Sequence, residues 1–172
     1  MPYKNLREFT DWLEKNGQLK RISEPISPIL EMTEIQTRVM ANNGPAILFE
    51  NVIKKNGERF PIPVLTNLFG TVERVAWGMN QTSETLRTLG ETLAFLRQPQ
   101  PPNGIKEALA MLPMVKSALA MKPTIVSKAP CQDIILKGDK INLYDLPIQT
   151  CWPEEPSPLI TCLLYTSDAA DE

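Results

Sequence analysis

The sequence predicts a mixed α/β (α+β) fold, because helical and strand-like segments alternate along its first half. Apolar residues recur every three or four positions over Leu6–Leu13 and again within Glu31–Ala41, which is the spacing of one helical face. Leu19–Ile22 and Ala46–Val52 are instead short segments bounded by turn-forming residues. The order helix, strand, helix, strand indicates a small α/β unit at the start of the chain.

The ends of these elements carry signals of their own. Asn5 is suited to cap the first helix, and Gly17 favours its end. Asn42-Asn43-Gly44-Pro45 ends the second helix. Asn56-Gly57 lies between the second strand segment and Phe60–Leu65, and this pair is typical of a hairpin turn, here within a somewhat longer loop.

Two further helices and a linker are predicted in the middle of the chain. Thr71–Gly78 and Thr82–Arg97 have helical patterns, and the proline-rich Pro99–Gly104 is the clearest linker. Ile105–Met121 is an amphipathic helix that Pro113 breaks or kinks. Core packing is the default for its Leu/Met stripe, and a surface for a partner or a membrane is the alternative.

The last part of the chain indicates the start of a second, mainly β domain. Asp133–Lys137 is predicted to be a strand, Gly138-Asp139 a turn, and Leu143–Ile148 a second extended segment. In Leu146–Thr161, LPIQTCWPEEPSPLIT, four prolines frame Trp152. Each proline fixes its own φ and extends the preceding residue, so this run is a rigid connector that ends in strand-like residues.

Composition limits the chemistry that the chain can perform. It has 172 residues and no histidine, so no Ser-His-Asp or Cys-His catalytic arrangement can be built from it. The net charge of −2 does not favour nucleic acid or an anionic membrane surface. No apolar run reaches the length of a membrane span. Cys131, Cys151 and Cys162 lack CxxC spacing, and the cytoplasm is the simplest compartment.

A few residues have both a chemical and a structural interpretation. The adjacent carboxylates Glu154-Glu155 suggest acid–base chemistry, but a solvated loop is favoured. Cys131 and Cys151 are interpreted as buried small hydrophobic residues rather than nucleophiles or ligands. Trp152 either anchors its loop to the core or lies beside a planar cofactor. The glycines are not spaced as a phosphate-binding loop.

Five segments of the chain match one known pattern in order and spacing: Tyr3–Ile22, Gly44–Val52, Pro63–Thr71, Ala129–Ile148 and Leu146–Thr161. With these segments in register, the chain resembles the UbiD family of prenylated-flavin decarboxylases, and among them the bacterial 3-polyprenyl-4-hydroxybenzoate decarboxylases of ubiquinone biosynthesis. The resemblance covers Met1–Thr161.

The resemblance implies a division of the chain into four parts. Residues 1–98 form the N-terminal α/β domain, and residues 99–128 form the linker and amphipathic helix. Residues 129–161 are the first strands of a truncated split-β-barrel flavin-binding domain. Residues 162–172, CLLYTSDAADE, depart from the family and look like a translated sequencing adapter, so we expect an inactive N-terminal fragment; a divergent natural terminus is the alternative.

The resemblance also implies an activity and a cofactor. The full-length parent would remove CO₂ from 3-polyprenyl-4-hydroxybenzoate without oxidation, with prenylated FMN as the electron sink and Mn²⁺ beside it. Thr161 matches a family threonine near the cofactor, and a β-branched strand residue is the alternative interpretation. No catalytic or metal-binding residue is assigned within Met1–Thr161, and this chain itself is expected to bind no cofactor.

Partners and alternatives follow from the same resemblance. The parent is expected to bind its polyprenyl-hydroxybenzoate substrate, to form a homo-oligomer and to bind no nucleic acid. It is expected in the cytoplasm, and peripheral association with the inner membrane is the alternative. Two other functions stay open: another UbiD-type decarboxylase of aromatic or phenolic acids, and a non-catalytic binding module.

Overall fold

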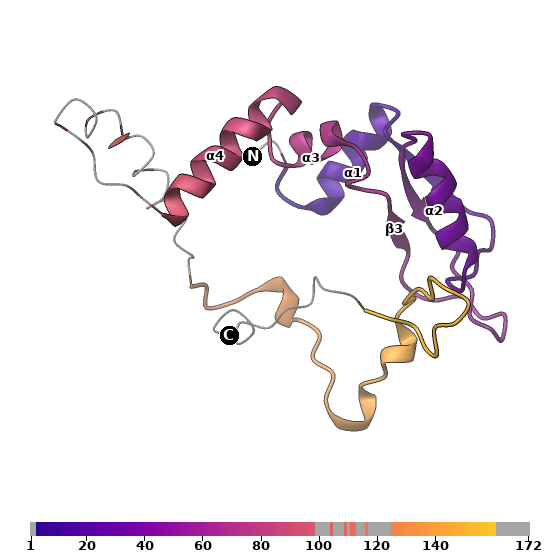
Figure 1. Cartoon of the computed structure of the whole chain (residues 1–172). Coiled ribbons are helices and arrows are strands. Elements are labelled where there is room, and N and C mark those ends of the chain that lie inside the picture. Colours follow the sequence, from indigo (N-terminus) through magenta and orange to yellow (C-terminus); the bar gives the residue numbers. More distant parts are fainter. Residues whose placement is uncertain are drawn as a thin grey trace. The chain divides into compact units, whose positions relative to one another are not determined.

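The computed structural model describes residues 3–98 and 125–160, and between them only Gly104, Leu109, Met111, Leu112 and Lys116. Figure 1 shows the chain with its helices and strands labelled. The described part divides into two units. The first unit holds the described residues of Met1–Asn80 and Ile141–Glu172, and the second holds those of Gln81–Lys140.

A three-stranded mixed sheet forms the centre of the first unit. The order of the strands is β1 (Leu19–Ile22), β2 (Ala46–Phe49) and β3 (Val64–Thr66). β1 pairs in parallel with β2, and β2 pairs antiparallel with β3. Parallel neighbours require a crossover connection, which helix α2 (Glu31–Ala41) supplies. The predicted mixed α/β fold is therefore confirmed.

Helix α1 (Leu6–Lys15) has the ends that the sequence predicts. The Oδ1 atom of Asn5 accepts a hydrogen bond from the backbone N–H of Glu8 at 2.9 Å, which satisfies one of the free donors of the first turn. Gly17 follows the helix with φ of +70°, a conformation that glycine adopts without steric cost.

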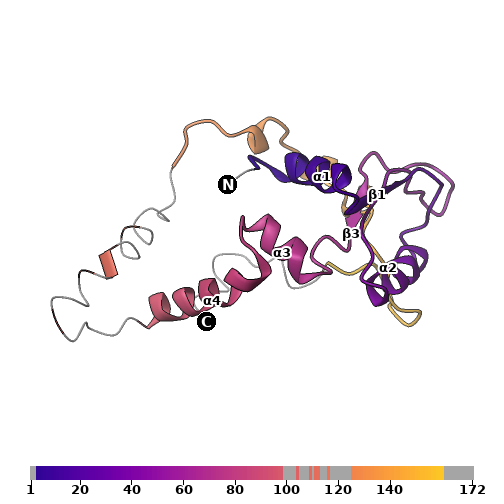
Figure 2. The same ribbon diagram turned by 90° about the horizontal axis from the view of Figure 1, so that it is seen from above.

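The core lies on both faces of the sheet, because successive side chains of β2 point to opposite faces. Figure 2 shows strands of the sheet between α1 and α2. The buried cluster on the α1 side consists of Phe9, Leu13, Leu19 and Ala46. The buried cluster on the α2 side consists of Met32, Ile47, Phe49, Val52 and Phe60. Ile35 and Val39 pack against the second cluster, so the apolar residues predicted to share one face within Glu31–Ala41 face the core. Burial of each large apolar side chain contributes about 1.5–3 kcal/mol.

The predicted hairpin joins β2 to β3 through a longer loop. Ile53 and Arg59 form an antiparallel bridge, and the N–H of Lys54 donates to the carbonyl of Glu58 at 2.7 Å. Gly57 lies at the turn with φ of +84°. The Asn-Gly signal therefore placed the turn correctly, because a residue with positive φ is needed there.

Helices α3 (Val72–Gly78) and α4 (Ser83–Arg97) confirm the next two predictions. Thr71 caps α3, and Thr82 with Thr85 forms a capping box at the start of α4. Most of the predicted linker and of the helix over Ile105–Met121 lies outside the described residues. The domain boundaries expected at residues 98 and 128 stay predictions.

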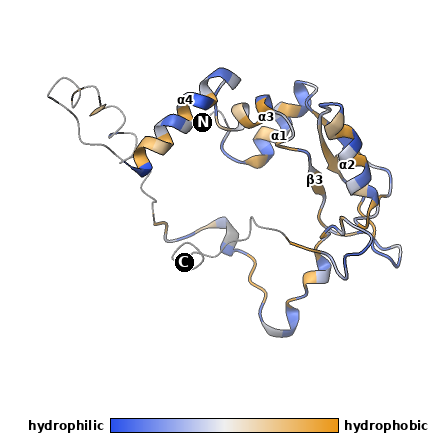
Figure 3. Cartoon of the chain, in the orientation of Figure 1, coloured by the Kyte–Doolittle hydropathy of each residue, from blue (hydrophilic) through white to orange (hydrophobic). Residues whose placement is uncertain are grey.

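The prediction of a strand over Asp133–Lys137 is wrong. Its residues have no regular structure, and the side chain of Ile134 is 81% exposed. Three-residue 3-10 turns stand on either side of it and within the predicted extended segment that follows: η1 (Pro130–Gln132), η2 (Gly138–Lys140) and η3 (Leu143–Asp145). Figure 3 shows hydrophobic residues in orange along this irregular stretch. A strand requires a neighbouring backbone to pair with, and no described segment pairs with this one.

Across residues 3–98 and 125–160, no helix combines the length and the apolar character that crossing a membrane requires.

Candidate functional site

The one predicted cofactor contact, Thr161, lies outside the described residues, as does the tail Cys162–Glu172. The side chain of Cys131 is not described either. Cys151 is a free thiol and is partly buried, which fits the small-hydrophobic interpretation better than a reactive, exposed thiol does.

The connector before Thr161 is held against the start of α2. The N–H of Thr150 donates to the carbonyl of Pro28 at 3.1 Å, and the N–H of Leu30 donates to the carbonyl of Thr150 at 3.0 Å. Ile29 and Thr150 thereby form a parallel bridge. The Lys54 ammonium lies 3.6 Å from a carboxylate oxygen of Asp145, the residue before the connector, and this ion pair also holds the connector in place. Residues far apart in the sequence therefore fix the path of the connector.

The acidic pair of the connector divides into two roles. One carboxylate oxygen of Glu155, Oε2, accepts the backbone N–H of Cys151 at 2.5 Å and that of Trp152 at 3.2 Å. Glu155 is half-buried and shapes the turn, whereas Glu154 is exposed. The solvated-loop interpretation is therefore correct only for Glu154. Neither carboxylate has the geometry of an acid–base pair, because Glu155 is committed to backbone donors.

Trp152 does not anchor its loop to the core, because its side chain is 61% exposed. The turn is held by the two backbone bonds to Glu155, and these need no buried indole. Of its two interpretations, only contact with a cofactor beside the connector stays a prediction.

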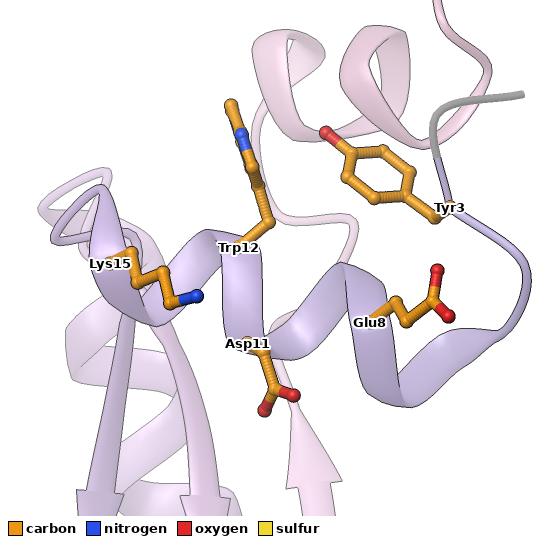
Figure 4. Close-up of a pocket in the computed structure, with 5 residues that line it drawn as sticks. All are labelled: Tyr3, Glu8, Asp11, Trp12 and Lys15. Carbon is orange, nitrogen blue, oxygen red and sulfur yellow. The ribbon is translucent and has the colours of Figure 1, made fainter.

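An open groove of about 330 Å³ runs along the outer face of α1. Figure 4 shows its lining residues, Tyr3, Glu8, Asp11, Trp12 and Lys15. Glu8 accepts the backbone N–H of Lys4 at 2.8 Å, and burial raises the pKa of the Tyr3 hydroxyl. The groove has aromatic walls and mixed charges but no nucleophile beside a base, so its residues do not form a catalytic arrangement.

A buried arginine, which the sequence gave no reason to single out, joins α3 to the sheet. The side chain of Arg74 is fully buried. Its guanidinium donates to the carbonyls of Leu68 at 3.2 Å and Asn67 at 3.1 Å, and to the side-chain oxygen of Gln18 at 3.4 Å. Burial lowers the pKa of Arg74, because desolvation disfavours the charged form. Its partners are neutral oxygens, so Arg74 is a structural residue.

A second cation, Arg21, lies at the surface of β1 among carboxylates. Its guanidinium lies 2.8 Å from Glu14, 3.0 Å from Glu50 and 3.8 Å from Asp11. The hydrogen bonds from Arg21 hold the pKa of the Glu14 carboxyl below its ordinary value. The same pairs raise the pKa of Arg21. The arrangement is a partly exposed ion-pair network and contains no group free to transfer a proton.

The described residues do not form the metal site that the family implies. Within residues 3–98 and 125–160, no group of three His, Cys, Asp or Glu side chains is placed to hold a metal ion. The whole sequence also lacks histidine.

Comparison with known proteins identifies the family to which the chain belongs, a family of carboxy-lyases. The model of the 3-octaprenyl-4-hydroxybenzoate carboxy-lyase N-terminal domain matches residues 10–93. The model of the Rift-related domain of the same enzyme family matches residues 124–172. The chain belongs to the UbiD family of carboxy-lyases.

Solved structures of UbiD-class enzymes resemble the chain. Vanillic acid decarboxylase of Sedimentibacter hydroxybenzoicus in its closed form is 25% identical over 87% of this chain, with a TM-score of 0.58. Its open form is 27% identical over 88% of this chain, with a TM-score of 0.53. An evolved dimeric form of HmfF from Pelotomaculum thermopropionicum, in complex with prFMN, is 29% identical over 58% of this chain, with a TM-score of 0.45. The chain spans 27%, 29% and 21% of these three chains, respectively.

Proposed function

We propose that the chain is the N-terminal part of a prenylated-FMN-dependent, non-oxidative decarboxylase of 3-polyprenyl-4-hydroxybenzoate that acts in ubiquinone biosynthesis. The observation that carries the proposal is the pair of family matches, with the N-terminal domain followed along the chain by the Rift-related domain. The resemblance of the five segments to bacterial enzymes of this pathway supports the substrate.

In this proposal the described residues supply a scaffold. The sheet and the core cluster on the α2 side hold α2, and the segment that leads into α2 holds the connector through bonds of Pro28 and Leu30 to Thr150. The connector leads to Thr161, which is proposed to lie beside the cofactor in the full-length enzyme. Prenylated FMN, with Mn²⁺, supplies the electron sink for loss of CO₂ when it is bound.

The domain arrangement and the partners are part of the same proposal. Residues 1–98 form the N-terminal domain, 99–128 the connection, and 129–161 the start of the flavin-binding domain. The full-length enzyme is proposed to be a cytoplasmic homo-oligomer, with peripheral association with the inner membrane as the alternative.

A second candidate is a UbiD-type decarboxylase of a smaller phenolic acid. It is favoured by the likeness to vanillic acid decarboxylase, which extends over 87% of the chain with a TM-score of 0.58. The described residues do not distinguish the two substrates, because no side chain among them forms a substrate pocket with a catalytic pair.

The experiment begins with the nucleotide sequence beyond the codon for Glu172. If the reading frame continues into a flavin domain, the complete protein is expressed with prenylated FMN and Mn²⁺. CO₂ release is then measured with 3-polyprenyl-4-hydroxybenzoate and with vanillic acid. Release from the polyprenyl substrate alone supports the first proposal, and release from vanillic acid alone supports the second. A genuine stop codon after Glu172, with no activity on either acid, would favour a non-catalytic binding module.

A further inference from the structure

Leu30 has a backbone conformation that its side chain does not favour. Leu30 is one of four described non-glycine residues with positive φ. The other three are all asparagines: Asn43, Asn67 and Asn80. Asparagine tolerates positive φ far better than leucine does. Leu30, with φ of 64° and ψ of −38°, is therefore the position where backbone strain is concentrated.

The strained residue is the centre of a γ-turn. The N–H of Glu31 donates to the carbonyl of Ile29 at 2.8 Å, which closes a three-residue ring around Leu30. A γ-turn with positive φ is rare and strained. Such a turn persists only where the surrounding structure holds it in place.

The connector provides that restraint from outside the loop. Thr150 bonds the chain on both sides of Ile29, through its N–H to the carbonyl of Pro28 and through its carbonyl to the N–H of Leu30. Both bonds are made by the backbone of Thr150, so its side chain is not needed. The neighbouring Gln149 amide also contacts the sulfur of Met32, at 3.6 Å.

The turn is also tied directly to α2. Leu30 is the N-cap of this helix, and its carbonyl accepts the first helical bond, from the N–H of Glu34 at 2.9 Å. Met32, two residues further on, is fully buried in the core cluster on the α2 side. A change in the turn must therefore move the first turn of α2.

We propose that Pro28–Leu30 and Gln149–Thr150 form a conformational clamp, in which docking of the connector holds the strained turn and thereby sets the start of α2. When the connector leaves, Leu30 relaxes to negative φ and the first turn of α2 loosens. The clamp couples the segment that precedes Thr161 to the N-terminal core. This inference concerns the folding of the chain and does not depend on the proposed decarboxylase activity.

The first test is amide hydrogen exchange on the full 172-residue chain. Thr150→Pro removes the N–H that donates to Pro28, whereas the matched control Thr150→Ala keeps both backbone bonds. Exchange at Leu30 and Glu31 is expected to accelerate about tenfold in Thr150→Pro and to stay within twofold in Thr150→Ala. Exchange at Leu13 in α1 is expected to stay unchanged. Equal exchange at Leu30 and Glu31 in both variants would overturn the clamp.

The second test addresses the strain itself. Leu30→Gly removes the side chain and the strain, and Leu30→Ala removes most of the side chain but keeps the strain. The Gly variant is expected to show a higher melting temperature than the Ala variant, and a smaller effect of Thr150→Pro on exchange at Glu31. If Thr150→Pro fails to fold, the Gly-against-Ala comparison stands alone. A higher melting temperature for Leu30→Ala, or additive effects of the two positions on exchange, would contradict the proposal.

Discussion

Arg74 illustrates how a charged residue becomes part of a core. Its guanidinium is fully buried under α3, and its fork of N–H donors reaches two backbone carbonyls and the side chain of Gln18. These oxygens belong to the segment after β3 and to the residue before β1. Arg74 therefore joins two parts of the first unit through donors that only a guanidinium supplies in this geometry.

Replacing Arg74 should destabilise the fold strongly. Arg74→Met keeps most of the volume but removes the donor to the carbonyl of Leu68 and one of the two donors to the carbonyl of Asn67, which also accepts the N–H of Gly70. A buried group left unsatisfied costs about 1–3 kcal/mol. Urea denaturation should show a loss of roughly 2–5 kcal/mol in the free energy of unfolding. The control Arg87→Met removes an exposed i,i+4 ion pair with Glu91. It should change the free energy of unfolding by less than about 0.5 kcal/mol. Equal losses would show that Arg74 is not a core donor.

Gly70 has a steric requirement that is absent at Gly90. A Cβ atom at Gly70 would lie 1.8 Å from the Oδ1 atom of Asn67, whereas a Cβ atom at Gly90 would meet no atom within 4 Å. The Asn67 amide is needed where it is, because it donates to the carbonyls of Gly44 at 3.1 Å and Pro45 at 2.9 Å.

The same substitution should therefore have opposite effects at these two glycines. Gly70→Ala should lower the free energy of unfolding of the first unit by about 1–3 kcal/mol, because it displaces Asn67. Gly90→Ala, inside α4, should stabilise that helix by about 0.5–1 kcal/mol. Thermal unfolding by circular dichroism measures the first effect, and amide exchange in α4 measures the second. A stable Gly70→Ala protein would mean that Asn67 moves without loss.

Local signals explain why helices α1 to α4 and strand β1 were predicted to within a residue or two, whereas β2 ends earlier than the predicted segment Ala46–Val52 and β3 lies at the end of the predicted segment Phe60–Leu65. Asn5, Thr71 and Thr82 cap helices, and Gly57 forms a turn, because the required side chain or backbone conformation is encoded at one position. The strand Asp133–Lys137 was wrong because its pairing partner is not encoded locally.

The site was less predictable for the same reason. The burial of Arg74 and the docking of Thr150 on Leu30 depend on contacts between distant parts of the chain. Because arginine side chains are usually exposed, the sequence gave no reason to expect Arg74 in the core. A bridge between two backbones does not depend on the type of side chain, so the sequence pattern does not indicate it. The proline frame around Trp152 predicted an irregular connector correctly, but it did not indicate where the connector docks.

The ion pairs that join α1 to β1 should make stability depend on pH. The pKa of Glu14 in the folded state is lowered from about 4.5 by Arg21. A lowered carboxyl pKa stabilises the fold above the unfolded value, and this contribution is lost as pH falls through the folded pKa. The melting temperature of Arg21→Gln should therefore lie below that of the wild type at pH 7, and the difference should shrink as pH falls below about 4.5.

Two comparisons make this prediction specific. Lys20→Gln removes a neighbouring positive charge on β1 and should leave the pH dependence close to that of the wild type. Added salt should reduce the effect of Arg21→Gln on the melting temperature, because the ion-pair network of Arg21 is partly exposed. A difference between Arg21→Gln and the wild type that grows on acidification would contradict the assignment to Glu14.

At the scale of the whole molecule, the two family matches and the described contacts support a structural role for the described residues. The first unit folds around its own sheet and holds the connector by backbone bonds. Among residues 3–98 and 125–160, no three His, Cys, Asp or Glu side chains are grouped to hold a metal ion. In the proposed function the described residues act as a scaffold, and the central expectation is that this chain by itself binds no flavin.

Flavin binding tests that expectation most directly. The purified 172-residue chain is incubated with prenylated FMN and Mn²⁺ and passed through gel filtration, with vanillic acid decarboxylase as the positive control. The account predicts that the flavin absorbance co-elutes with the control enzyme and is absent from the peak of this chain, which nevertheless shows the circular dichroism of a folded α/β protein. Stoichiometric flavin in the peak of this chain would contradict the account.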